Sequence, residues 1–455
     1  MHERKRTARL SLPLKRLALT LSILILLTSS FDTFLVLTVG GNYRFCQIAT
    51  PVLVLLALIQ AARARAIPVL GAVPLCIWFV FQLSFIPTTG FWPKSVGYCL
   101  WLLLNYSLIF AFVQLFSDDT EPLRAILRWY AYSFGLLAVF GIVQFFLPLL
   151  GGPGILVQQW WIPGVLARVS GFSYEPSYFA TYLLIGFVFI GTLRRRSSTL
   201  LPAKVLLAIY LLTAAAIFLS SSRMGIIFLF LDVVLAHLPP WRPFLKTFAN
   251  SRVSLPKLRA LIPSFVSVGL VVAIWISAPA IIEHNPAAAL MLLNGTGVSD
   301  TAAHSLVQRE DSLEETLTVF KQHPVLGRSL GGVSSAIADL TGERIQSFED
   351  SKQFEGMSVF AEVLAASGAI GVLPFIWFIV AMFRDPLRLA RVAPPFYSGL
   401  LYALLRSSAM AWAILQFNQN ILRPYLWTHI AILATVYAAT RRQLMKDAAQ
   451  QACSQ

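Results

Sequence analysis

The chain has 455 residues, of which 57% are apolar and only 13% are charged, and its formal net charge is +15. Ordinary soluble domains carry about 25% charged residues, whereas apolar stretches long enough to cross a ~30 Å hydrocarbon core recur along nearly this whole sequence. The composition excludes a soluble domain, and the absence of alternating segments of ~10 residues excludes a membrane β-barrel. We therefore predict an all-α polytopic membrane protein.

Twelve segments are predicted as transmembrane helices. They are residues 17–39, 46–62, 68–86, 96–116, 127–150, 176–193, 199–220, 224–238, 260–282, 357–383, 396–417 and 422–440. With a cytoplasmic N-terminus, most Lys and Arg residues fall on the cytoplasmic side, which is the usual bias in membrane proteins. Topology thus explains the positive charge without nucleic-acid binding, and both termini are predicted to be cytoplasmic. No small-residue cleavage site follows the first apolar segment, which favours a retained signal anchor.

The predicted spans divide the chain into three parts. Residues 1–282 hold nine helices and a long outer loop, 151–175, while residues 357–455 hold three helices and a cytoplasmic tail. Between them, residues 283–356 form a large, acidic outer loop, the only part that resembles a water-soluble domain. The basic segment 239–259 is predicted to lie on the cytoplasmic surface. The large outer loop has no cysteine, so no disulfide framework or thiolate metal site is indicated.

One helix is predicted inside the large outer loop. Ser312 can cap its N-terminus, and Glu315 three residues later can complete a capping box. Pro324 in the following HPVLG disfavours helical backbone at the preceding residue, so the helix should end there. The next residues, GRSLGG, are predicted as a flexible turn beside a cleft.

Three arginines lie in polar segments on the predicted outer side. Arg168 stands in ARVSGFSYEPSYFATY, Arg223 at the end of SSSR, and Arg309 in QREDSLEE. A guanidinium group binds phosphate through two parallel hydrogen bonds and keeps its charge. The shared side predicts a site for a diphosphate or another polyanion. Alternatively, each arginine anchors the chain at the membrane surface or pairs with a nearby acidic residue.

Glu175 lies in the YEPSY turn, immediately before a predicted helix. Pro176 would occupy the first helical position, where a proline fixes the backbone favourably. A carboxylate there can accept a proton from an acceptor hydroxyl or hydrogen-bond a sugar. The alternatives are stabilisation of the helix dipole and a salt bridge to Arg168.

Asp32, Asp232 and Arg406 lie within predicted spans. Charge there is costly and is usually paired or functional. Arg406 either pairs with Asp232 or lines the path of an anionic lipid. The sequence contains no HExxH, CxxC, P-loop or GxGxxG pattern, so neither a protein-held catalytic metal nor nucleotide hydrolysis is expected.

These motifs together resemble a known family. R-x-S-G-F-x-x-E-P-S-x-F-A precedes one predicted span, S-S-R follows a later one, and R-x-x-S…F-x-x-H-P-V-L-G lies in the large outer loop. With EVLAASGAIGVL at Glu362–Leu373 and the order of the twelve spans, the combination resembles the O-antigen ligase/polymerase superfamily over about residues 120–440.

The resemblance implies a fold, a chemistry and a location. Members are GT-C-type membrane glycosyltransferases that move glycans from undecaprenyl diphosphate at the periplasmic face of the bacterial inner membrane, without a metal or other cofactor. Arg168, Arg223 and Arg309 would bind the diphosphate, because fixed positive charges stabilise such a leaving group. Further candidates for substrate binding are His323, Arg328 and Arg406. The expected partners are the lipid-linked glycan, the bilayer, a chain-length regulator and a flippase.

This chain departs from the family pattern at one position that separates ligase-like members from polymerases. Ligase-like members carry histidine, often His-Asn, eleven residues before the glycine that matches Gly368, but this chain has Met357 and Ser358 there. The E-P-S form of the first motif also looks more like repeat-unit polymerases. We therefore favour a polysaccharide repeat-unit polymerase, with Glu175 as the candidate carboxylate near the acceptor.

Three other functions remain open. The first is a sibling enzyme, an O-antigen ligase or a protein O-oligosaccharyltransferase. The second is a transporter or flippase for polysaccharide or lipid-linked glycan, although the chain lacks the evident internal symmetry that such proteins often show. The third is a scaffold, which leaves the outer arginines unexplained.

Overall fold

The computed structural model describes residues 11–39, 42–64, 66–196, 199–237, 300–356, 358–417 and 421–454. The protein is mostly helical, at 74%. Among the described residues, five helices are long and apolar enough to cross a membrane: α2 (Phe45–Arg63), α4 (Trp92–Phe116), α5 (Thr120–Leu149), α6 (Pro176–Arg195) and α15 (Val359–Ala390). The chain is thus an α-helical protein with the helices of a membrane protein.

The remaining apolar segments are also helical where the structure describes them. They form α1 (Leu12–Thr28), α3 (Ala72–Ser84), α7 (Ala203–Leu219), α8 (Arg223–His237), α16 (Pro395–Ile414) and α17 (Pro424–Ser454). The predicted ninth span, 260–282, and the predicted cytoplasmic segment, 239–259, lie outside the described residues. The five long helices do not establish the predicted number of twelve spans.

The prediction that the first span extends to residue 39 is wrong. Helix α1 ends at Thr28, and the strands β1 (Val36–Thr38) and β2 (Asn42–Arg44) then pair in antiparallel fashion. The hydroxyls of Thr28 and Ser29 donate to carbonyls of the last turn, which ends the helix. Asp32 follows outside the helix, where it can meet the charged partners that its carboxylate requires.

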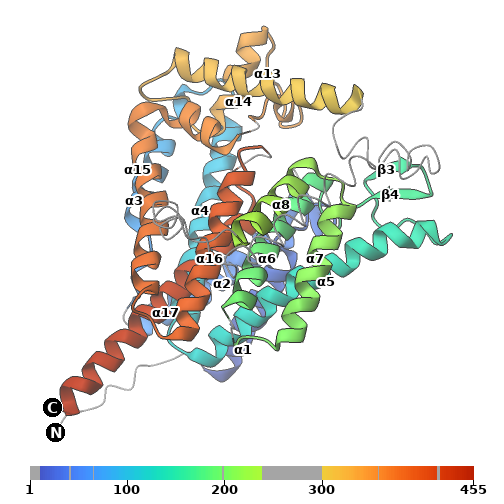
Figure 1. The fold of residues 1–455 in the computed structure, drawn as a ribbon. Coiled ribbons are helices and arrows are strands. Elements are labelled where there is room, and N and C mark those ends of the chain that lie inside the picture. Colours follow the sequence, from blue (N-terminus) through green and yellow to red (C-terminus); the bar gives the residue numbers. More distant parts are fainter. Residues whose placement is uncertain are drawn as a thin grey trace, which may run out of the picture.

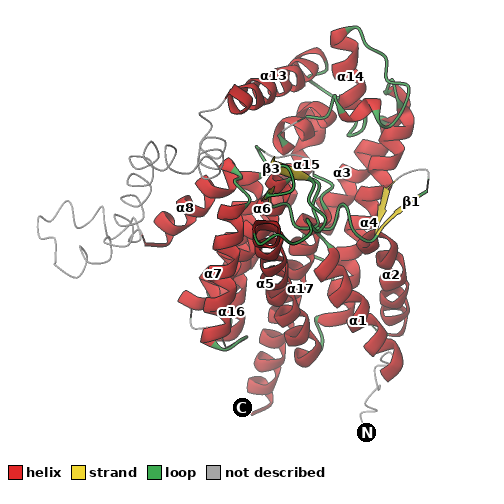
Figure 2. Cartoon of the chain, turned by 90° about the vertical axis from the view of Figure 1, so that its right-hand side faces the viewer, coloured by secondary structure: helices red, strands yellow, loops and turns green. Residues whose placement is uncertain are grey.

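Helix α6 lies at the centre of the bundle (Figures 1 and 2), and 94% of its most apolar 18-residue stretch is buried. It packs against α5, α7, α8 and α16. Small residues allow this close packing, since a Cβ atom at Gly186 would collide with Phe134 of α5. A helix that is covered on all sides by protein can hold its N-terminal residues in fixed positions.

Two further helices cover one end of the bundle. Helix α13 (Asp300–Gln322) crosses this end beside α14 (Gly332–Thr341), and the start of α1 and the end of α17 lie at the opposite end (Figures 1 and 2). We call the side of α13 and α14 the covered end. Short 3-10 turns at Ile86–Thr88 (η1) and Asp350–Lys352 (η2) complete the helical elements of the described chain.

The predicted start of the helix at Ser312 is wrong, whereas its predicted end is confirmed. Helix α13 already begins at Asp300, since the preceding residues include the good helix formers Ala, Leu, Gln, Arg and Glu. Ser312 is therefore inside the helix, and its Oγ donates to the carbonyl oxygen of Glu355 at 3.4 Å. The helix ends at Gln322, just before His323 and Pro324.

The GRSLGG segment is not a flexible turn beside a cleft, because it fits tightly into a break in α15. Gly368 interrupts that helix with φ +61°, and the freed backbone groups bond to the loop after α13. Four hydrogen bonds of 2.8–3.1 Å join the two: Arg328 N to Ala365 O, Ser329 N to Ala366 O, Ala369 N to Pro324 O, and Ile370 N to Val325 O. A Cβ atom at Gly327 or Gly368 would collide with the opposite backbone.

Candidate functional site

The outer loop 151–175 contains a short hairpin that holds Arg168. Strand β3 (Gln159–Ile162) pairs with β4 (Leu166–Arg168) in antiparallel fashion. The buried Gln144 of α5 fixes both sides of this loop: its amide donates to the carbonyls of Ile155 and Leu156, and its oxygen accepts from the backbone of Ser170 and Gly171. Gln144 thereby binds the loop 151–175 to the helical bundle.

Arg168 occupies the last position of β4 and is half-buried. Its Nη1 donates to Gln159 Oε1 at 2.9 Å, and its guanidinium group lies 5.0 Å from the ring centre of Trp161. These two contacts orient the guanidinium plane along the hairpin. A planar guanidinium group held in this way keeps its charge and a fixed orientation.

Glu175 immediately precedes α6, and the prediction that the helix begins at Pro176 is confirmed. The Glu175 side chain is exposed and forms no hydrogen bond that caps the helix. Instead, its Oε2 accepts a hydrogen bond of 2.9 Å from Ser177 Oγ. The exposed carboxylate is thus available to a hydroxyl group of a ligand.

Arg223 begins helix α8, whereas the sequence predicted that it ends the preceding helix. The three serines form the break between α7 and α8, with Ser221 at φ +51°. Ser222 caps the new helix, since its Oγ accepts from the backbone of Gly225 at 3.3 Å. A Cβ atom at Gly225 would meet Ala180 of α6, so the first turns of α6 and α8 lie side by side.

The other predicted residues occupy different environments. The backbone of Arg309 belongs to α13, but its side chain lies outside the described part of the structure, so the gathering of three arginines remains a prediction. Arg328 Nη1 donates to the carbonyl oxygen of Thr88 at 3.2 Å. Burial and the charge of Arg328 lower the pKa of His323 below its ordinary value of 6.5.

Arg406 pairs with Asp232, which was one of its two predicted roles. Its Nη2 lies 2.8 Å from Asp232 Oδ1, its Nε donates to the same oxygen at 2.9 Å, and Nη2 also donates to the Asp232 carbonyl oxygen at 3.0 Å. Asp232 is fully buried, while the arginine side chain is 29% exposed. The contacts connect α8 to α16 and give this arginine a structural partner.

The structure adds a charged cluster that the sequence did not indicate. Asp32 Oδ1 lies 2.8 Å from Arg44 Nη2, and Asp32 Oδ2 lies 3.2 Å from Arg423 Nη1. The guanidinium group of Arg423 also covers the Tyr178 ring at 3.6 Å from its centre. Two guanidinium groups therefore contact one carboxylate, and the charge of Glu355 also acts on Arg423. The only sequence signal for Arg423 is its place within the predicted span 422–440, where charge is costly.

The cluster of Asp32, Arg44 and Arg423 contacts ARVSGFSYEPSYFATY, the segment that carries Arg168 and Glu175. The backbone N–H groups of Asp32 and Thr33 donate to the carbonyl oxygen of Phe172, at 2.9 and 3.1 Å. The charges of Asp32, Glu175 and Glu355 all act on Tyr178 in the first turn of α6. The structure thus brings Glu175, which the sequence predicted, close to Arg423, which it missed.

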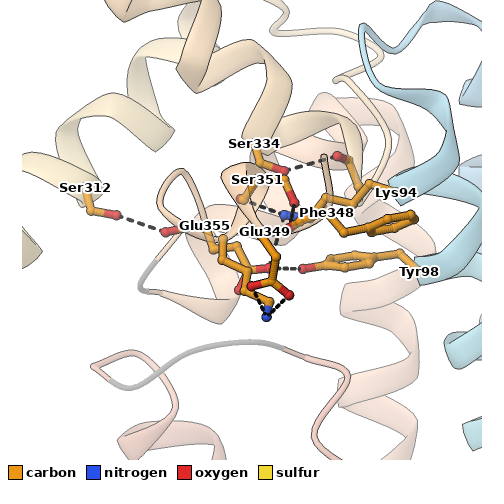
Figure 3. Close-up of polar contacts among 10 residues, drawn as sticks. Lys94, Tyr98, Ser312, Ser334, Phe348, Glu349, Ser351 and Glu355 are labelled. Carbon is orange, nitrogen blue, oxygen red and sulfur yellow. Dashed lines mark hydrogen bonds and ion pairs between the residues drawn. The ribbon is translucent and has the colours of Figure 1, made fainter. Parts of the chain in front are cut away.

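A second unpredicted cluster lies beside the covered end (Figure 3). Lys94, only 3% exposed, donates to the carbonyl oxygen of Ser351 at 2.9 Å and lies 3.1 Å from Glu355 Oε1. Tyr98 donates to the same Glu355 oxygen at 2.9 Å. The first two turns of α4 therefore hold the segment that follows α14.

Within the described part of the chain, no group of three or more His, Cys, Asp or Glu residues could hold a metal ion. No family model matches the sequence, and no curated protein matches it.

Proposed function

We propose that the protein is a glycosyltransferase that polymerises undecaprenyl-diphosphate-linked oligosaccharide repeat units into O-antigen or exopolysaccharide. In this proposal, twelve spans form a GT-C-like bundle in the bacterial inner membrane, and the covered end faces the periplasm. The motifs that resemble the O-antigen ligase/polymerase superfamily support it. The observation that carries it is the pair of guanidinium groups, Arg44 and Arg423, that contact Asp32 beside the loop of Arg168 and Glu175.

The chemistry requires charge stabilisation more than proton donation to the leaving group. A sugar–diphosphate bond is already activated, and the departing diphosphate carries negative charge that fixed guanidinium groups stabilise. Arg168 and Arg223 are the predicted diphosphate ligands with described side chains, and Arg309 is the third. Glu175 is the exposed carboxylate that can contact the acceptor sugar.

The test uses the purified full chain and lipid-linked repeat units. We expect a ladder of products, and we expect Arg168→Ala, Arg223→Ala and Arg309→Ala each to abolish long chains while the protein remains in the membrane. Arg344→Ala is the matched control, since Arg344 is exposed beyond α14. Normal chains in all three variants would contradict a shared diphosphate site.

Other products would point to the other functions. Single-step transfer onto a lipid A core or a protein would indicate a ligase or an O-oligosaccharyltransferase. Movement of the lipid-linked glycan across the bilayer without transfer would indicate a flippase.

A further inference from the structure

The cluster of Lys94, Tyr98 and Glu355 needs an explanation, since a buried lysine is costly. Moving an ammonium group out of water requires a paired charge and hydrogen bonds, and an apolar contact would often stabilise the fold equally well. Lys94 has such a pair in Glu355 and a carbonyl acceptor in Ser351. The side chain of Glu355 is 19% exposed, so this carboxylate connects the buried lysine to the surface.

The two hydrogen-bond donors both meet the same oxygen of Glu355. Lys94 Nζ at 3.1 Å and Tyr98 OH at 2.9 Å contact Oε1 (Figure 3). Among the described residues, Oε1 is the only carboxylate oxygen of Glu355 with such a contact. The two donors fix the orientation of the carboxylate, while Oε2 keeps its lone pairs for another proton donor.

A second carboxyl group lies behind the first. Glu362, in the first turn of α15, is only 4% exposed, and its Oε2 has no hydrogen-bond partner in the described part of the chain. The charges of Glu355 and Lys94 both act on Glu362.

The same carboxylate acts electrostatically on the arginine cluster, since the charge of Glu355 acts on Arg423 and on Tyr178. Glu175 also acts on Tyr178, but it is exposed and already bonds to Ser177, which suits contact with a sugar hydroxyl. Among these acidic groups, Glu355 alone combines partial exposure with a cation and a phenol that orient it.

Given the proposed function, we propose that Glu355 is the catalytic base that takes the proton from the acceptor hydroxyl. The acceptor oxygen then forms the bond to the anomeric carbon of the donor sugar. The bond from that carbon to the diphosphate oxygen breaks, and its electron pair leaves with the lipid diphosphate. The proton passes from Glu355 to the aqueous side, which its 19% exposed side chain reaches.

The test compares Glu355→Gln with Glu349→Gln in the purified full chain. The amide oxygen introduced by Glu355→Gln can still accept from Lys94 and Tyr98, so we expect unchanged binding of the lipid-linked repeat unit and a fall in kcat of about 10²–10⁴-fold. Glu349 lies on the same segment, 77% exposed and paired with Lys352, and its substitution should leave kcat unchanged. Tyr98→Phe, which removes one orienting hydrogen bond, should lower kcat by about tenfold without weakening donor binding.

Each outcome decides the question. Absence of transfer by the unsubstituted protein contradicts the proposed function itself. Transfer by the unsubstituted protein, together with normal kcat in Glu355→Gln, contradicts only the assignment of the base. Loss of donor binding in both Glu355→Gln and Tyr98→Phe would show that the cluster holds the fold and does no chemistry.

Discussion

Two buried carboxylates in this protein meet arginines in different proportions. Asp232 is fully buried and has one guanidinium partner, Arg406, which contacts it through two nitrogens. Asp32 has two, Arg44 and Arg423, and one of them also lies over an aromatic ring. The Asp232–Arg406 pair joins two helices, whereas the Asp32 cluster brings two guanidinium groups from distant parts of the chain to one carboxylate. Under the proposed function, the first contact is structural and the second belongs to the donor-binding site.

The first way to test this comparison is to remove the arginine of the Asp232–Arg406 pair. Arg406→Ala leaves Asp232 without its cation in the interior, and such a loss costs about 3–5 kcal/mol of folding free energy. We expect little protein in the membrane and a strongly lowered thermal unfolding midpoint of what remains. Wild-type levels of protein with normal stability would show that the pair is not structural.

The matched control replaces both partners. Asp232→Asn combined with Arg406→Gln removes both charges together, so we expect it to recover most of the lost protein level. If the double variant is stable but makes no polymer, Arg406 has a second role in contact with the substrate, as the sequence allowed.

The second prediction concerns the Asp32 cluster, where Arg44 and Arg423 contact one carboxylate. Arg423→Lys keeps the charge near Asp32 but loses the planar group, so we expect stable protein and a fall in kcat/KM of about 10-fold to 10²-fold, corresponding to about 1.5–3 kcal/mol. Donor binding and polymer length measure the effect. An unchanged kcat/KM would mean that Arg423 does not bind the donor.

The sequence revealed the local features of both sites but not their partners. Pro176 at the start of α6 and Pro324 after α13 act on neighbouring residues, so their effects were predictable. Asp32 and Arg423 are 391 residues apart, and Tyr98 and Glu355 are 257 apart, so no spacing rule indicates either contact. Arg406 and Asp232 could be paired only because charges within apolar spans need partners.

The third prediction compares two glycines that both have positive φ, only one of which lies against another part of the chain. At Gly368, with φ +61°, a broken helix meets the loop after α13, and Gly368→Ala introduces both strain and a collision with Val325. We expect a cost of about 1–3 kcal/mol, seen as a lower unfolding midpoint and faster proteolysis between α13 and α14. Gly342→Ala is the matched control, because Gly342 also has positive φ but its Cβ atom would meet nothing within 4 Å. A larger effect at Gly342 would show that strain, not the fit between loop and helix, dominates.

The smallest predicted effect concerns a pair of cations at the covered end. Burial and the charge of Arg328 lower the pKa of His323, so the unfolded chain takes up the proton more readily than the folded protein. Stability from this group is present above the ordinary histidine pKa of about 6.5 and is lost as the pH falls below it. Between about pH 7.5 and about pH 5.5, the unfolding midpoint of the unsubstituted protein should fall more than that of His323→Gln. An equal fall in both would assign the acid sensitivity to other groups, and a steeper fall in His323→Gln would reverse the sign that the Arg328 charge predicts.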